Sequence, residues 1–247
     1  AATTREAVTF AALWPYLVVG VFVPGLLTIA FLWAIREAGP SRTAVFINTF
    51  PLFSAVFAIV FLDEPLRAGL AIGTLLVVAG TIGIAVQTDT PAEYRGAAFR
   101  LALVVMLGAA AVVGGRDTAI RWASERDDVP AIVGVAATLV SGLAAILFYT
   151  CMTSRRSERG LVPRARRAAF PFTAIGVLAG FNTVLIFEAL ERGRVTIVSP
   201  LIGTAMLWTL VFSVILLGRG EGLGRRVVGS ALLVAGGVAL ISVTRGG

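Results

Sequence analysis

The sequence predicts an all-α integral membrane protein with eight transmembrane helices, arranged as two inverted-topology repeats of three and five spans. Hydrophobic residues make up 57% of the chain and charged residues 14%, whereas a typical soluble domain carries about 25% charged residues. The apolar residues lie in long uninterrupted runs, which is typical of membrane spans. In addition, the phrase LLVVAG at 75–80 returns almost unchanged as LLVAGG at 232–237.

The composition excludes several classes of function. The chain contains no histidine, which removes the commonest general base and metal ligand, and Cys151 alone cannot form an internal disulfide. A net charge of +7 in a soluble protein would suggest nucleic acid, but these arginines lie at the ends of apolar runs. There they act as topology signals and contact lipid headgroups. We therefore expect membrane lipids as partners, and no nucleic acid, metal, cofactor or enzymatic activity.

Cutting the chain at its charges leaves uncharged stretches at 7–35, 43–62, 68–88, 101–115, 129–154, 168–187, 195–218 and 227–244. A helix needs about 20 apolar residues to cross the hydrocarbon core. The first stretch is longer and carries Pro15 and Pro24, which predicts tilt or a kink, with a core beginning near Leu13. A re-entrant turn before a shorter span is the alternative. The stretch 101–115 is too short, so we expect its helix to continue to Ala123.

The repeated phrase marks the closing span of each half of a duplicated unit. FLWAIREAG (31–39) likewise matches IFEALERGR (186–194), and both are followed by a basic link, a span, a charged link and a glycine-bearing span. We therefore divide the chain into a first repeat, 1–90, and a second, 91–247. Because a five-span unit has odd parity, its two copies would have inverted topology, which places a substrate site at the midplane. The unequal halves predict two further spans upstream, lost by truncation or by decay of the copy.

At 34–86 and 189–240 the sequence resembles the EamA-type ten-span members of the drug/metabolite transporter superfamily. The shared pattern includes a span with an early proline and a glutamate at its exit, which the first copy meets with Pro51 and Glu64. The second copy departs from the pattern, because Pro200 lies earlier in its span. The resemblance implies solute transport by alternating access in a multi-pass protein of a prokaryotic inner membrane. It does not imply one particular solute.

Charged residues inside the predicted spans are candidate site residues, because an unpaired charge in hydrocarbon costs several kcal/mol. The continued helix pulls Arg116 and Asp117 inward, where Asp117 could pair with Arg121 four residues later. These charges would line a solute path, or else belong to a short span whose end charges reach the interface. Glu188 closes an apolar span and is a candidate proton carrier if it faces a cavity, or a hydrated side chain if it lies at the membrane face.

Neutral side chains supply the remaining candidates for solute binding. Asn48 and Thr49 precede Pro51, whose ring frees a backbone carbonyl one turn earlier. A freed carbonyl beside an amide suits a neutral or zwitterionic solute, with Asn182 as partner from the other repeat; alternatively, both amides bond between helices. Trp208 lies in the middle of its stretch and is the first candidate for a cavity aromatic, although such residues also form interface belts. The other aromatics with these two alternatives are Trp14, Tyr16 and Trp33.

Glycine spacing predicts close contacts between helices, either within the chain or across a homodimer. Glycines that recur on one face of a helix allow two backbones to approach. The residues with such spacing are Gly69, Gly73, Gly80, Gly176, Gly180, Gly229 and Gly236.

The two arguments on membrane orientation disagree. Loop 152–169 is rich in arginine, and the positive-inside rule places it in the cytoplasm with both termini outside. The family resemblance implies the reverse, with the C-terminus inside.

The sequence therefore predicts a secondary transporter for a small metabolite or drug. One rival is a membrane assembly subunit that transports nothing itself. The other is a membrane-embedded lipid enzyme, which could draw only on Asp117, Glu188 and the arginines. A polar cavity between the repeats would favour the transporter, and a dry, fully packed interior would favour the subunit.

Overall fold

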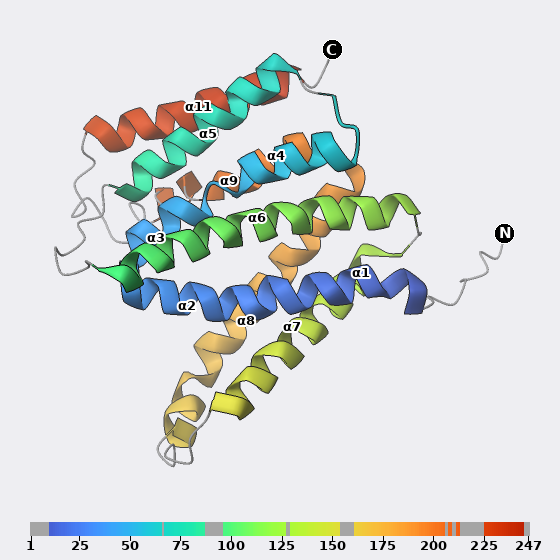
Figure 1. The fold of residues 1–247 in the computed structure, drawn as a ribbon, viewed down its shortest axis with the longest axis vertical. Helices are drawn as coiled ribbons and strands as arrows, with labels where there is room; N and C mark the ends of the chain where they lie inside the picture. The colour runs from blue at the N-terminus through green and yellow to red at the C-terminus, as the bar shows by residue number, and fades with distance from the viewer. Residues whose placement is uncertain are drawn as a thin grey trace.

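The computed structural model describes residues 10–65, 67–86, 96–126, 129–153, 161–205, 207–208, 211–212 and 225–244, and this part of the chain is helical with short links (Figure 1). Five helices in it are long and apolar enough to cross a membrane, and shorter apolar helices cover Ala68–Gly83 and Gly229–Ile241. These helices coincide with seven of the eight predicted spans, and the remaining span, 195–218, is only partly described, with a helix at its start. The all-helical membrane fold is thus confirmed.

The first half of the chain begins with one long apolar segment, Phe10–Ala38, that is interrupted by a kink. At Val23, which precedes Pro24, the backbone has φ −136° and ψ 106°, because a residue before proline is driven out of the helical region. The predicted kink is confirmed and the re-entrant alternative is wrong. The helices of this half are α1 (Phe10–Gly20), the π-helical η1 (Val21–Leu26), α2 (Leu27–Ala38), α3 (Pro40–Ile47), α4 (Phe50–Phe61) and α5 (Ala68–Val86).

The second half is built around one long helix that runs through the middle of the bundle. This helix, α6, packs against α2, α3 and α4 and also touches α8 and α9 (Figure 1). Its extent confirms that the helix of the short stretch 101–115 continues past Ala123. The helices of this half are α6 (Ala97–Arg126), α7 (Ala131–Thr153), α8 (Leu161–Arg192), α9 (Val195–Gly203) and α11 (Arg225–Thr244).

Helices α5 and α11 form a closely packed pair at one edge of the bundle (Figure 1). A Cβ on Gly80 would lie 2.6 Å from the carbonyl oxygen of Ser230, and a Cβ on Gly237 would lie 2.7 Å from that of Gly73. Gly69 likewise faces α11, at Thr244. The predicted glycine contact is therefore made by all three glycines chosen on α5.

On α11 and α8 the glycine prediction needs correction. Gly229 and Gly236 have no described neighbour within 4 Å, and the glycine that meets α5 is Gly237. Gly176 and Gly180 on α8 are equally open within the described part of the chain. A shift of one residue turns a position by about 100° around a helix, so spacing alone did not select the glycines that face a neighbour. A homodimer contact at the open positions stays a prediction.

Helix α7 lies against the kinked first segment through glycines outside the predicted set. A Cβ on Gly134 would lie 2.8 Å from the ring of Tyr16, and one on Gly142 would lie 2.9 Å from the carbonyl oxygen of Gly20. Tyr16 is 1% exposed and stacks on Phe187 of α8, with ring centroids 6.1 Å apart. Tyr16 is therefore a core residue, neither a cavity aromatic nor part of an interface belt.

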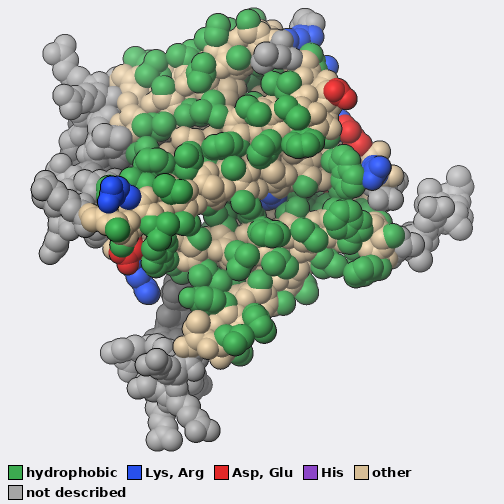
Figure 2. Space-filling model, viewed as in Figure 1, with side chains coloured by type: hydrophobic (Ala, Val, Ile, Leu, Met, Phe, Trp, Pro, Cys, Tyr) green, Lys and Arg blue, Asp and Glu red, His purple; other side chains and the backbone are tan. Residues whose placement is uncertain are grey.

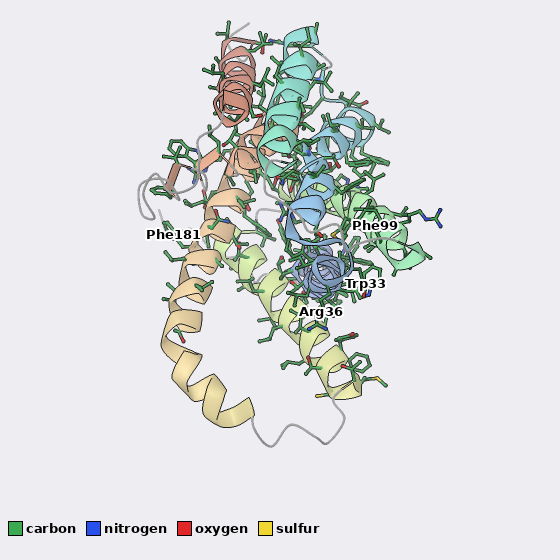
Figure 3. All side chains as sticks on the ribbon, turned by 90° about the vertical axis from the view of Figure 1, so that its left-hand side faces the viewer. Trp33, Arg36, Phe99 and Phe181 are labelled. Atoms are coloured by element: carbon green, nitrogen blue, oxygen red, sulfur yellow. The ribbon has the colours of Figure 1, made fainter. Side chains whose placement is uncertain are left out.

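The two tryptophans of the first segment, Trp14 and Trp33, each contact a neighbouring aromatic or apolar cluster. Trp33 of α2 and Phe99 of α6 pack against the same buried cluster, and Figure 3 labels both side chains on these two neighbouring helices. Trp14 contacts Trp122 edge to face, with ring centroids 6.3 Å apart, and is half exposed. Its place in the first turns of α1 fits an interface belt.

The face of the bundle drawn in Figure 2 is largely apolar, and most of its charged side chains lie toward its two sides. Large side chains such as Val140, Phe148 and Val177 are exposed, and Phe181 lies on the outer side of α8 (Figure 3). Exposing these apolar side chains to water would cost free energy, whereas exposing them to lipid tails does not. We refer below to the end of the bundle where α4, α6 and α8 finish and α9 begins as the α9-start face.

Candidate functional site

A fully buried carboxylate lies in the central helix of the bundle. Asp117 is 0% exposed and stands about 14 Å from the end of α6 at Arg126, at about 1.5 Å of rise per residue. The carboxylate therefore lies inside the bundle, well before the charged end of this helix. The prediction that the extended helix pulls this charge inward is confirmed.

Two serines from different helices donate hydrogen bonds to the same oxygen of Asp117. The Ser199 hydroxyl of α9 lies 2.7 Å from Oδ2, and the Ser54 hydroxyl of α4 lies 3.1 Å from it. The Ser54 hydroxyl is also 3.1 Å from the carbonyl oxygen of Phe50, so its proton is shared between the two acceptors. A single carboxylate therefore connects α4, α6 and α9. We call Asp117 with its three partners, Ser54, Arg116 and Ser199, the Asp117 junction.

Arg116 supplies the positive charge of the junction. Its Nη2 and Nε atoms lie 2.6 and 3.0 Å from Oδ1 of Asp117, and its side chain is 16% exposed. The predicted pairing of Asp117 with Arg121 is wrong. Arg121 instead pairs with Glu125 at 2.8 Å and donates a hydrogen bond to the backbone carbonyl of Glu191. Residues 117 and 121 share a helix face, but the buried face at Asp117 is occupied by α4 and α9.

Gly114 lets α4 come close enough for Ser54 to reach the carboxylate. A Cβ at Gly114 would lie 2.6 Å from the backbone nitrogen of Ser54, a distance that real Cβ atoms do not adopt. Gly114 is one helical turn from Asp117 on α6, so the close approach and the hydrogen bond belong to the same contact. Neither Gly114 nor the two serines was among the site residues predicted from the sequence.

The helices on either side of the junction are broken at corresponding places. Between α3 and α4, the amide and hydroxyl of Thr49 both donate to the carbonyl of Phe46, at 3.2 and 2.7 Å. At the end of α9, the amide and hydroxyl of Thr204 donate to the carbonyl of Leu201 at 3.1 and 2.7 Å. The spacing from Thr49 to Thr204 equals that from FLWAIREAG (31–39) to IFEALERGR (186–194).

The two broken helices run in opposite directions beside each other. The end of α4 meets the start of α9, where the Glu64 carboxylate accepts a hydrogen bond from the amide of Val195 at 2.7 Å. Each break lies five residues, or about 7 Å, from the serine that binds Asp117, on the side away from the α9-start face. Thr49 lies 12 residues before the end of α4, and Thr204 lies 9 residues after the start of α9. At about 1.5 Å per residue these are about 18 and 14 Å from the α9-start face, about halfway through a hydrocarbon core about 30 Å thick.

The remaining predicted polar residues take different positions. Asn48 lies at the break before α4, and its amide donates to the carbonyl of Ala44 at 2.7 Å. Asn182 is exposed on α8, and no hydrogen bond joins it to Asn48 within the described part of the chain. The predicted pairing of the two amides is therefore not made. Trp208 is 57% exposed on the segment after the second break.

Glu188 lines a groove of about 560 Å³ between α8 and α9. Its carboxylate is 2.5 Å from Arg192, which also lines the groove together with Arg194. The Glu188 side chain is 37% exposed and belongs to the last turns of α8, so its position fits the hydrated alternative better than that of a buried proton carrier. A second, apolar groove of about 380 Å³ lies between α4 and α6, lined by Phe57, Phe61, Gly115, Thr118, Ala119 and Trp122.

These features define a class of protein: a multi-pass helical membrane protein whose two halves contribute broken, antiparallel helices to a buried ion pair. The chain matches the family model of the EamA-like transporter family over residues 2–86 and 100–243, and it belongs to this family. Membership confirms the resemblance to the drug/metabolite transporter superfamily.

Comparison with solved structures supports the same fold. One similar structure, described as "Crystal structure of protein", has a TM-score of 0.72 and 20% sequence identity, and the match covers 96% of this chain and 79% of that chain. At this identity the likeness shows the fold alone. A comparison with curated proteins gave no match.

Proposed function

We propose that this chain is a secondary transporter that moves a small metabolite or drug across a cell membrane by alternating access. The solute binds near the bilayer midplane, between the break before α4 and the break after α9. Backbone groups and polar side chains at the two breaks contact its polar part, and the apolar flanks of α4 and α6 contact the remainder. The other expected partners are membrane lipids.

The observation that carries this proposal is the pair of matching breaks at Thr49 and Thr204 beside a buried ion pair. Irregular backbone at membrane depth is tolerated where it is buried in protein or lines a cavity, because lipid cannot satisfy its polar groups. In transporters built from inverted repeats, discontinuous helices in corresponding positions supply the solute site. The family membership of the chain supports the same conclusion.

The Asp117 junction has the role of a releasable contact in this proposal. Asp117 and its partners join α4 and α9 to the central helix α6 in the conformation described here. A second conformation, open to the other side of the membrane, needs these helices to separate at one side of the site. A solute shifts the balance between the two conformations only if it binds them with different affinity.

A thermal-shift panel on the detergent-purified protein tests the proposal first. Amino acids, nucleotide sugars, sugar phosphates and lipophilic cations are compared, because a ligand that binds only the folded state raises Tm. We expect one class to raise Tm, and the rise to be lost in Asn48→Ala and Thr49→Ala. Thr150→Ala is the matched control, since Thr150 makes the same type of bond, to the carbonyl of Ile146, on an exposed face of α7.

Counterflow exchange in liposomes then tests whether the bound solute is moved. The class that raises Tm should exchange across the membrane with the wild type and with Thr150→Ala, but not with Arg116→Ala. If no class raises Tm and none exchanges, the transporter proposal is refuted, and the assembly-subunit alternative becomes the better account.

A further inference from the structure

The start of α9 is buried, so its first backbone amides need hydrogen-bond acceptors from elsewhere in the protein. Residues Val195 to Pro200 are all buried, and the first amides of a helix have no acceptor within the helix itself. The residue before the helix, Arg194, gives no side-chain hydrogen bond to it. Arg194 contributes only its backbone carbonyl, which accepts from the amides of Ile197 and Val198 at 3.0 Å each.

Glu64, from the other half of the chain, supplies the missing acceptors. Its Oε1 accepts from the amide of Val195 at 2.7 Å, and its Oε2 accepts from the amide and the hydroxyl of Thr196 at 3.0 and 2.6 Å. The carboxylate also places a negative charge at the positive end of the helix dipole. Charge-assisted bonds of this kind are about twice as strong as bonds between neutral groups.

The link after α4 is shaped to deliver this carboxylate. Helix α4 ends at Phe61, Asp63 takes a left-handed φ of 51°, and the amide of Glu64 donates back to the carbonyl of Ala58 at 3.3 Å. The chain thus folds back at the α9-start face, and the Glu64 side chain is left only 8% exposed. Glu64 is therefore fixed to the end of α4 and to the start of α9 at once.

The consequence lies one helical turn further along α9. Ser199 follows Val195 by four residues, and its hydroxyl donates to Asp117. Helix α4 holds α9 at Glu64 and also sends Ser54 to the same carboxylate. The register of α9 against α4, and with it the distance from Ser199 to Asp117, depends on the Glu64 bonds.

We infer that Glu64 is a positioning residue for the Asp117 junction: by capping α9 it makes α4 and α9 one unit and holds Ser199 on Asp117. This inference rests on the proposed function for its role in transport, since it describes how the releasable contact is kept closed. When the junction opens, α4 and α9 move together and part from α6, because the Glu64 bonds keep the two helices in register.

Hydrogen exchange of α9 tests the capping contact without any solute. Glu64→Gln keeps the shape of the side chain but removes its charge and turns one acceptor into a donor. We expect the amides of Val195 and Thr196 to exchange at least about tenfold faster, while peptides from the first half of α6 stay unchanged. Glu125→Gln is the matched control, because this carboxylate is exposed at the same face of the membrane. Unchanged exchange at 195–196 would overturn the inference.

A milder variant guards against loss of the fold. Thr196→Val removes only the hydroxyl bond to Glu64 and keeps the volume of the side chain. It should accelerate exchange in the same two amides, by less than Glu64→Gln.

A double-mutant cycle separates positioning from simple stabilisation. If Glu64 acts through α9, combining Glu64→Gln with Ser199→Ala should lower Tm and solute exchange no further than the worse single variant. Combining Glu64→Gln with Ser54→Ala should give the sum of the two effects, because Ser54 reaches Asp117 from α4 itself. Additive effects in the Ser199 cycle would reduce Glu64 to a stabilising cap and refute positioning.

The two proposals fail separately in this design. If the wild type binds and exchanges no solute, the transporter proposal falls, while hydrogen exchange and the Tm cycle still decide the role of Glu64. If the wild type exchanges solute, and Glu64→Gln changes neither the hydrogen exchange of the α9 amides nor the transport rate, only the positioning inference falls.

Discussion

Replacing Asp117 by asparagine should destabilise the protein strongly although the two side chains have nearly the same shape. Asp117 is 0% exposed and Arg116 is 16% exposed, so the substitution leaves a mostly buried positive charge without its counter-charge. Removing one partner of a buried ion pair costs about 3–5 kcal/mol. Because the asparagine oxygen can still accept a hydrogen bond, we take the lower end, about 3 kcal/mol, which lowers Tm by roughly 6–12 °C for a chain of this length.

The assay is thermal unfolding in one detergent, with tryptophan fluorescence as the signal. Glu125→Gln serves as the control, since it breaks the exposed Arg121–Glu125 pair, whose expected contribution is below about 1 kcal/mol. The decisive variant is the double substitution Arg116→Met with Asp117→Leu. It removes both charges together, so it should recover at least half of the Tm lost in Asp117→Asn.

Two results would refute this reasoning. If Asp117→Asn melts within about 1 °C of the wild type, the buried pair does not hold the helices together. Arg116→Met and Asp117→Leu are also measured singly. If the Tm lost in the double substitution equals the sum of these two single losses, the cost does not come from an unpaired charge.

The remaining predictions concern close contacts between helices. Gly237→Ala should lower Tm strongly, because its Cβ would lie 2.7 Å from the carbonyl oxygen of Gly73. Gly236→Ala, which has no described neighbour within 4 Å, should be neutral or slightly stabilising. Equal changes in Tm for the two variants would contradict the described face of α11. Gly134→Ala should weaken the contact of α7 with the ring of Tyr16 and reduce the yield of folded protein, as measured by size-exclusion chromatography, and a normal elution profile would argue against this contact.

Gly114 and the serines beside Asp117 show why part of the site was beyond sequence-based reasoning. Arg116 and Asp117 could be found, because a charge inside an apolar helix is conspicuous in any membrane sequence. Ser54, Ser199 and Gly114 give no such signal, since serine and glycine are ordinary in membrane helices. A search for small polar residues flanking the proline-containing spans of both repeats would have brought the two serines forward.

The sequence by itself determined which segments are apolar and long enough to cross a membrane, and it predicts that the chain has two related halves. In hydrocarbon each helix must satisfy its own backbone hydrogen bonds and present apolar side chains to lipid, so a span can be recognised from its own residues. The same local reasoning placed the kink near Pro24 and drew Asp117 into the membrane.

Only the tertiary structure decided which side chains meet. The rotation of each helix about its axis selected Gly237 over Gly236 and Arg116 over Arg121, because a single residue turns a side chain by about 100°. The contacts of Glu64 with α9, and of the two serines with Asp117, join residues far apart in the chain. They depend on the packing of the two halves against each other, which no local pattern in the sequence encodes.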